Sequence, residues 1–78
     1  MSKTVTMYGG SWCQPCKQVK PKLIKKAIDE DWTFEYIDVE DDPCPPEVHS
    51  VPTVFVKDGP VTSGPFVGVT DIRKEFAL

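Results

Sequence analysis

Two cysteines three positions apart, Cys13 and Cys16, are the residues of this chain whose types and spacing could do chemistry. If a helix begins at this point, its unpaired backbone N–H groups and its dipole favour a negative charge on Cys13, and so the thiolate. The thiolate is the nucleophile of thiol–disulfide exchange, and Cys16, one turn further, is then placed to attack the mixed disulfide. Pro15 fits a first helical turn, where a missing N–H costs little. Trp12 would cover the outer side of the nucleophile.

The same two cysteines could instead bind a metal ion or an iron–sulfur cluster. A zinc site generally needs a second ligand pair at similar spacing, and Cys44 and His49 do not supply one, so no metal site is predicted. Cys44 lies between prolines. We interpret it as a bystander thiol, with glutathionylation, an intermolecular disulfide or a place near the cysteine pair as alternatives. His49 is interpreted as a surface side chain, with a modest part in partner contact as the alternative.

The composition excludes several classes of protein. The chain has 78 residues, of which 40% are hydrophobic and 27% are charged, so we expect residues 1–78 to form a single domain and a monomer. The net charge of -3 gives no reason to expect nucleic acid as a partner. No apolar run approaches the roughly 20 residues that cross a membrane, and no signal peptide follows Met1. We therefore expect a cytoplasmic protein, where a CxxC pair is catalytic or metal-binding.

Hydrophobic periodicity predicts a βαβ unit in the first half of the chain. Alternating β-forming residues predict strands at 3–8 and 32–38. Between them, residues 14–29 have the spacing of a helix. The apolar face of this helix comprises Val19, Leu23, Ile24, Ala27 and Ile28. The two strands are expected to be parallel, with a right-handed crossover. The lysines on the opposite face indicate a solvated surface, or, for Lys17 and Lys20, a role in stabilising a thiolate or attracting acidic partners.

The second half of the chain predicts an antiparallel pair of strands and a short helix. The strands are expected at 53–56 and within 61–67, and the helix at 72–78 with Thr70 or Asp71 as its N-cap. Residues 43–49 are rich in proline and can hold one helical turn at most.

The cysteine segment, Trp12-Cys13-Gln14-Pro15-Cys16-Lys17 with Pro21 five residues later, resembles the active-site helix of thioredoxins. Thioredoxins read WCGPCK there, followed by a proline that kinks the helix. Thioredoxins and glutaredoxins also share a Val/Ile-Pro-Thr step, which matches Val51-Pro52-Thr53 here. In those families the proline is cis and faces the cysteines, and the backbone of the preceding residue pairs with the substrate. The resemblance implies these roles for Val51 and Pro52.

The C-terminal segment is more similar to glutaredoxins. Many of them read Gly-Gly-x-Thr-Asp beside the glutathione groove, and this chain has Val67-Gly68-Val69-Thr70-Asp71. The first glycine is therefore lost, and so is the tyrosine of the usual glutaredoxin CPYC motif. The buried aspartate that thioredoxins place six residues before the first cysteine falls here on Met7.

Together these resemblances imply a minimal redoxin. The implied fold is α/β, a thioredoxin fold with a four-stranded mixed sheet in the order 2-1-3-4 flanked by about three helices. The implied function is reduction of disulfide-containing proteins, ribonucleotide reductase among them, with Cys13 as nucleophile and Cys16 as resolving thiol. No bound cofactor is expected. The reductant would be thioredoxin reductase with NADPH or, as the alternative, glutathione. A metal-binding protein and an interaction module with incidental cysteines stay open as other classes. The implied substrate-binding residues are Trp12, Gln14, Pro15, Lys17, Val51, Pro52, Gly68, Thr70 and Asp71.

Overall fold

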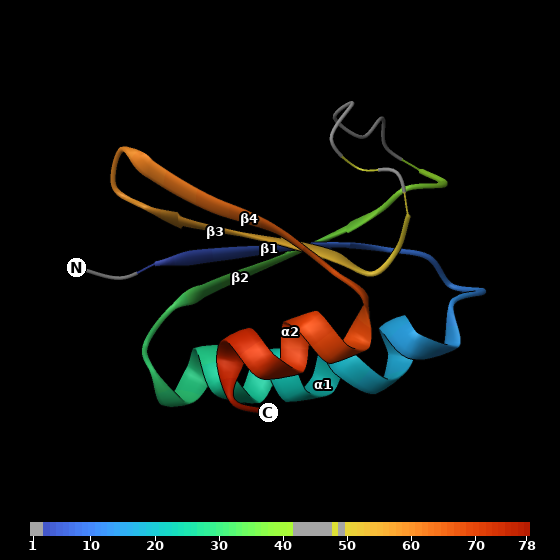
Figure 1. Cartoon of the computed structure of the whole chain (residues 1–78), viewed down its shortest axis with the longest axis horizontal. Coiled ribbons are helices and arrows are strands. Elements are labelled where there is room, and N and C mark those ends of the chain that lie inside the picture. The colour runs from blue at the N-terminus through green and yellow to red at the C-terminus, as the bar shows by residue number, and fades with distance from the viewer. Residues whose placement is uncertain (1–2, 42–47, 49) are drawn as a thin grey trace.

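The computed structural model describes residues 3–41, 48 and 50–78. Along the chain the elements are β1 (Thr4–Gly9), α1 (Gln14–Asp29), β2 (Thr33–Asp38), β3 (Thr53–Asp58), β4 (Val61–Val67) and α2 (Gly68–Phe76). The four strands form one sheet, and α1 and α2 lie on the same side of it (Figure 1).

The order of strands in the sheet is β2-β1-β3-β4, as predicted. The strands β1 and β2 are parallel, as a βαβ unit requires, whereas β3 is antiparallel to both β1 and β4. The register pairs Tyr8, near the end of β1, with Thr53, the first residue of β3. The loop that leaves β1 and the segment that enters β3 therefore meet at the same end of the sheet, where β1 ends and β3 begins.

The hydrophobic core lies between the sheet and the two helices. Alternate residues of β1 and β3 face it, and Met7 and Val54, which are paired across the two strands, are both fully buried. From the helices, Leu23 and Ile72 are equally buried. Phe76 closes the core with edge-on contacts to other rings, its ring centroid 5.9 Å from that of Phe66. Burial of these large side chains is the main term that stabilises so small a fold.

Three predictions about the helices were wrong. In the described residues the chain forms two helices rather than about three; residues 43–47 and 49, where a helical turn was considered, lie outside the described residues. The last helix begins at Gly68, so its N-cap is Val67, without a side-chain cap, and neither Thr70 nor Asp71. Ile28 was assigned to the apolar face of α1, yet it is 72% exposed because it lies one residue past Ala27 and so to the side of the buried stripe, which consists of Cys16, Val19, Leu23 and Ala27.

Within residues 3–41 and 50–78, no helix combines the length and the apolar character needed to cross a membrane.

Candidate functional site

The helix α1 begins where the cysteine spacing predicted. Cys13 is its N-cap, with extended backbone angles, and the Cys16 N–H donates to Cys13 Sγ over 3.2 Å. The Cys13 N–H donates to the Gly10 carbonyl, and the Cys13 carbonyl accepts a hydrogen bond from the Lys17 N–H. These two bonds connect the turn to the helix. Pro15 lies in the first turn, where no intrahelical N–H is lost. The position of Cys13 is therefore one that favours a negatively charged sulfur.

Cys13 and Cys16 form a disulfide bond, with their Cα atoms 5.2 Å apart. Both side chains belong to the core cluster, and their exposed fractions are only 5% for Cys13 and 2% for Cys16. Both cysteines are thus buried in the disulfide form, Cys13 slightly less than Cys16.

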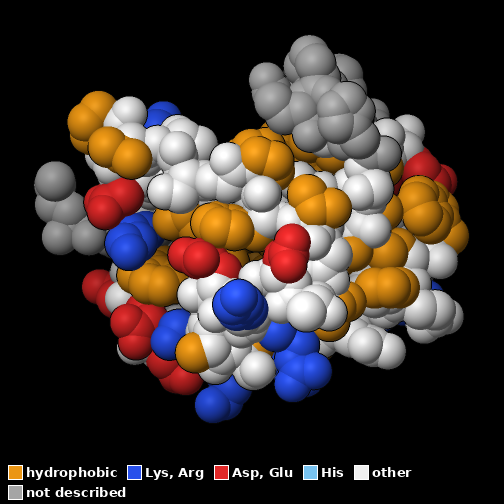
Figure 2. Space-filling view, in the orientation of Figure 1, with side chains coloured by type: hydrophobic (Ala, Val, Ile, Leu, Met, Phe, Trp, Pro, Cys, Tyr) orange, Lys and Arg blue, Asp and Glu red, His pale blue; other side chains and the backbone are white. Residues whose placement is uncertain are grey.

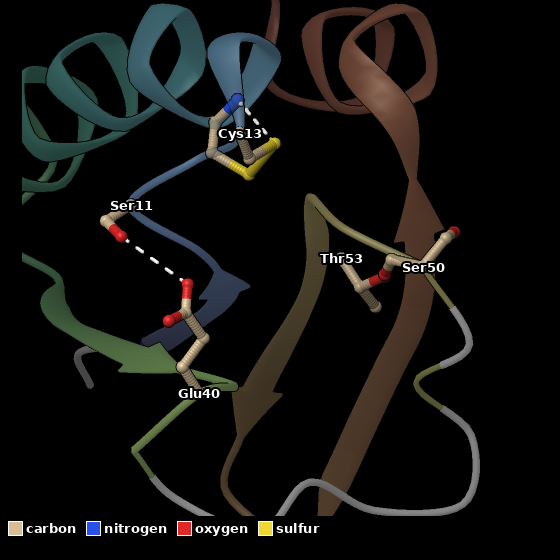
Figure 3. The surroundings of a disulfide bond; sticks show 6 residues. Ser11, Cys13, Glu40, Ser50 and Thr53 are labelled. Carbon is tan, nitrogen blue, oxygen red and sulfur yellow. Dashed lines mark hydrogen bonds between the residues drawn. A yellow bond between two sulfur atoms is a disulfide. The ribbon is translucent and has the colours of Figure 1, made fainter.

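The segment that enters β3 lies at the same end of the sheet as the cysteine turn (Figure 3). The Val51–Pro52 peptide bond is cis, as the resemblance implied. Pro52 is buried, and Val51 is half-buried and packs against the core cluster that contains both cysteines. The Thr53 hydroxyl donates to the Ser50 carbonyl, which closes this short turn.

The start of α2 is joined to this segment by one hydrogen bond. The Gly68 N–H donates to the Pro52 carbonyl over 2.9 Å, and Gly68 has a φ of 84°, a conformation that suits glycine. The structure thus brings Gly68 beside Pro52. Thr70 and Asp71 follow as exposed residues in the first turn of α2, which this hydrogen bond ties to the segment beside the cysteine site.

The remaining predicted contact residues form the outer rim of the cysteine turn. Trp12 is 61% exposed, and Gln14, Pro15 and Lys17 are also exposed on the first turn of α1. Figure 2 shows hydrophobic side chains gathered at the right-hand edge of the molecule, where the turn between β1 and α1 lies in Figure 1. An exposed tryptophan beside two buried sulfurs is the kind of apolar surface that a docked peptide can cover.

Tyr36 and Asp38, two members of a polar cluster behind Cys16, were missed from the sequence, whereas Lys20 was considered for a role in stabilising a thiolate. Tyr36 and Asp38 on β2 and Lys20 on α1 line a cavity of about 270 Å³ that reaches Cys16. Lys20 Nζ lies 3.9 Å from the centroid of the Tyr36 ring, which is a close cation–π contact. Desolvation by burial, followed by the charges of Asp38 and Glu40, raises the pKa of Tyr36 above its ordinary value.

The turn is also tied to the end of β2. The Ser11 hydroxyl donates to a Glu40 carboxylate oxygen over 3.4 Å, as Figure 3 shows, and the Val39 N–H donates to the Gly9 carbonyl over 2.9 Å. Met7, at the place of the thioredoxin aspartate, is fully buried in the core and has no titratable group.

In the part of the chain that the structure describes, no three side chains of His, Cys, Asp or Glu gather closely enough to hold a metal ion. Cys44 and His49 lie outside the described residues, so the interpretations given for them stay predictions.

The comparisons with known proteins agree with this geometry at the level of fold. No protein-family model and no curated protein matches the chain. Among solved structures, mitochondrial thioredoxin 3 from Saccharomyces cerevisiae, in its oxidised form, is 28% identical, with a TM-score of 0.78 over 97% of this chain and 76% of that one.

Two further thioredoxins are similar. Thioredoxin 1 from Thermosipho africanus is 25% identical, with a TM-score of 0.75 over 95% of this chain and 94% of that one. Thioredoxin O2 from Arabidopsis thaliana, in its oxidised state, is 24% identical, with a TM-score of 0.77 over 97% of this chain and 71% of that one. These neighbours and the Cys13–Cys16 disulfide support a disulfide oxidoreductase that has the thioredoxin fold and a CxxC redox site.

Proposed function

We propose that this chain reduces disulfide bonds in proteins through a cycle in which Cys13 and Cys16 alternate between dithiol and disulfide, and that thioredoxin reductase recharges it with electrons from NADPH. The observation that carries the proposal is the disulfide at the N-terminus of α1, where Cys13 is the N-cap. A cysteine in that position has a more stable thiolate, and the thiolate is the reactive form.

The cycle has two exchange steps. The Cys13 thiolate attacks one sulfur of the target disulfide, so that the other target sulfur leaves as a thiolate and a mixed disulfide forms. Cys16 then attacks the Cys13 sulfur, which closes the intramolecular disulfide and releases the target as a dithiol. The Cys16 N–H, 3.2 Å from Cys13 Sγ, is placed to donate to the negative charge of Cys13 before the first step.

Burial supports this order of steps. Cys16 is 2% exposed and lies inside the first turn of the helix, whereas Cys13 is 5% exposed and lies at the outer end of the helix as its N-cap. The proposed contact surface consists of the apolar rim of Trp12 and Pro15 on one side and of Val51 and Pro52 on the other. Gln14 and Lys17 extend this surface along the first turn of α1.

The choice of reductant is argued from the residues at the N-terminus of α2. Many glutaredoxins have two adjacent glycines beside the glutathione groove. In this chain Val67 stands in place of the first of these glycines, and it is 40% exposed. The Gly68 N–H is already bonded to the Pro52 carbonyl and is not free for a ligand. Thioredoxin reductase is therefore favoured over glutathione, although Thr70 and Asp71 remain available for the alternative.

The proposal extends to the setting of the protein. Residues 1–78 are proposed to act as a single-domain monomer in the cytoplasm, where thiols are kept reduced. The targets are proteins with accessible disulfides, with ribonucleotide reductase as one candidate from the resemblance.

A pair of coupled assays tests the function and the reductant together. Both follow NADPH oxidation on a protein disulfide substrate, one with thioredoxin reductase and the other with glutathione and glutathione reductase. Turnover in the first assay alone is the expected result. Turnover in the second alone would replace the proposed reductant with glutathione, and silence in both would overturn the oxidoreductase proposal in favour of the metal-binding or interaction classes.

Three single variants complete the test. Cys13→Ser should abolish turnover, and Cys16→Ser should stop the cycle at the mixed disulfide with the target. Cys44→Ser is the matched control, because it removes a thiol by the same substitution, and it should keep full turnover.

A further inference from the structure

The cavity behind the disulfide is the feature that the two exchange steps leave unexplained. It has a volume of about 270 Å³, is bounded on one side by Cys16, and its polar lining comes from two separate elements and from Ser11 in the turn between β1 and α1. Lys17 and Lys20 come from α1, and Tyr36 and Asp38 come from β2. Polar groups from two elements thus meet at the sulfur that lies farther from the surface.

The Tyr36 hydroxyl and that sulfur both lie beside Gly9 of β1. A Cβ atom built on Gly9 would be 2.8 Å from Tyr36 Oη and 3.2 Å from Cys16 Sγ, so the two atoms flank the same point of β1. The absence of a side chain at Gly9 is what leaves room for the hydroxyl there. Because β1 and β2 are paired in parallel from Thr4 to Gly9, the position of the Tyr36 backbone is set by the sheet itself.

Burial and the neighbouring carboxylates keep the Tyr36 hydroxyl protonated. Lys17 and Lys20 face the cavity from α1, while Asp38 and Glu40 lie on the β2 side. Burial, Asp38 and Glu40, in that order, raise the pKa of Tyr36, so the hydroxyl keeps its proton at neutral pH. A neutral phenol that keeps its proton is a hydrogen-bond donor for a neighbouring anion.

We propose that Tyr36 is a positioning residue for the resolving step, whose hydroxyl donates to the Cys16 thiolate across this cavity while Lys20 holds the ring in place. The inference rests on the proposed exchange between Cys13 and Cys16 and adds to it a group that acts on the second sulfur. Lys20 is suited to its part because its Nζ lies over the face of the Tyr36 ring.

The hydroxyl would act in both directions of the cycle. When a thiol reductant attacks Cys13 Sγ as its thiolate, the Cys13–Cys16 bond breaks, its electron pair goes to Cys16 Sγ, and the reductant is joined to Cys13. The new Cys16 thiolate then accepts the Tyr36 hydrogen bond. In the resolving direction the same bond keeps Cys16 deprotonated until it attacks Cys13. Hydrogen bonds to charged groups are stronger than those between neutral groups.

The first test measures Cys16 without any turnover. In a Cys13→Ser, Cys44→Ser background the only thiol is Cys16. The rate of its alkylation by iodoacetamide is measured as a function of pH. The pH at the midpoint of this curve is then compared between variants, rather than the rate at a single pH. Tyr36→Phe keeps the ring and removes the hydroxyl, and it should raise the midpoint by about one pH unit, a tenfold loss of thiolate.

Tyr8→Phe is the matched control. It removes a hydroxyl from a buried tyrosine on β1 that does not line the cavity, and it should leave the Cys16 midpoint unchanged. An unchanged midpoint in Tyr36→Phe, or an equal shift in both variants, would overturn the inference. Circular dichroism and the urea midpoint of each variant show that the fold is kept.

A second measurement uses the intact disulfide. Dithiothreitol opens the Cys13–Cys16 bond, and a less stable Cys16 thiolate is a poorer leaving group, so Tyr36→Phe should open several-fold more slowly than the wild type. Tyr8→Phe should open at the wild-type rate, and equal rates for all three proteins would overturn the inference. Neither measurement needs the physiological partners. No turnover in the coupled assays, together with a shifted alkylation midpoint, would therefore reject the proposed function but not the role of Tyr36. Turnover without a shift in the midpoint would reject the role of Tyr36 but not the proposed function.

Discussion

Replacing Gly9 by alanine tests the close packing of β1, Tyr36 and Cys16 directly. The new methyl carbon would lie 2.8 Å from Tyr36 Oη, 3.0 Å from Tyr36 Cε1 and 3.2 Å from Cys16 Sγ. Contacts this short require something to move. The tyrosine hydroxyl is at the end of a side chain and can shift, whereas the sulfur is held by the disulfide and by the first turn of α1.

Two opposing terms set the size of the effect. Overpacking of a filled site typically costs about 1–3 kcal/mol of unfolding free energy. Alanine in a strand recovers about 0.5–1 kcal/mol relative to glycine, because the unfolded glycine chain is more flexible. The packing term is the larger, so Gly9→Ala should lower the free energy of unfolding by about 1 kcal/mol. In a Tyr36→Phe background the closest atom is gone, so the loss caused by Gly9→Ala should be smaller.

The assay is urea unfolding of the four oxidised proteins of this double-mutant cycle, followed by circular dichroism. A positive coupling, with Gly9→Ala costing less in the absence of the hydroxyl, is the expected result. The reasoning is refuted if Gly9→Ala is as stable as the wild type, or if its cost is the same with and without the Tyr36 hydroxyl. Either result would mean that the hydroxyl does not occupy the space beside Gly9.

Three further predictions concern reactivity, pH and the core. Alkylation of Cys13 in a reduced Cys16→Ser, Cys44→Ser variant should have its midpoint below about 8.5, the value of a free thiol, and a midpoint at that value would contradict a helix-stabilised thiolate. Because the pKa of Tyr36 is raised in the fold, stability should be retained below about pH 10 and lost as the pH rises toward the folded-state pKa. Urea midpoints across this window should fall less in Tyr36→Phe than in the wild type. Phe76→Ala should cost about 3–5 kcal/mol, because Phe76 is 5% exposed and packs on two rings, whereas Val61→Ala, at a position 60% exposed, should stay within about 0.5 kcal/mol in the same unfolding assay.

Local sequence was sufficient to place the cysteine turn. The helix begins at Gln14 because Cys13 can cap it and Pro15 suits a first turn, and both features are visible within four residues. The parallel pairing of β1 and β2 follows from the long helix between them. The strand order and the cis bond before Pro52 came from the resemblance, since periodicity alone specifies neither.

The start of α2 could not be read locally because a distant group determines it. Thr70 and Asp71 are good capping residues, yet the helix begins earlier, at Gly68. There the Gly68 N–H is bonded to the Pro52 carbonyl, sixteen positions away, and the positive φ of Gly68 permits the sharp entry. A tertiary hydrogen bond thus overrides the local capping preference.

The cavity behind Cys16 was missed for a similar reason. The alternation of β2 places Tyr36 on the same face as Phe34, which by itself indicates a core position. Lys20 belongs to the lysine face of α1, which was interpreted as a solvated surface, with a role for Lys17 and Lys20 in stabilising a thiolate or attracting acidic partners as the alternative. That the two side chains meet, with Nζ 3.9 Å from the ring centroid, depends on how α1 crosses the sheet. The spacing of residues in the sequence does not predict how α1 packs across the sheet.

The two sulfurs of this site have different surroundings, and the difference supports different roles. Cys13 lies at the helix N-terminus, where a backbone N–H is directed at its sulfur and the rim of the site is open to a partner. Cys16 lies between the core and a cavity whose polar groups come from α1, from β2 and from Ser11 in the turn before α1. On the proposed roles, a thiolate at Cys13 is stabilised by the backbone, which most side-chain substitutions leave in place, whereas a thiolate at Cys16 depends on side chains such as Tyr36. Nucleophilic attack should therefore tolerate substitutions in the cavity, and the resolving step should be the one that responds to them.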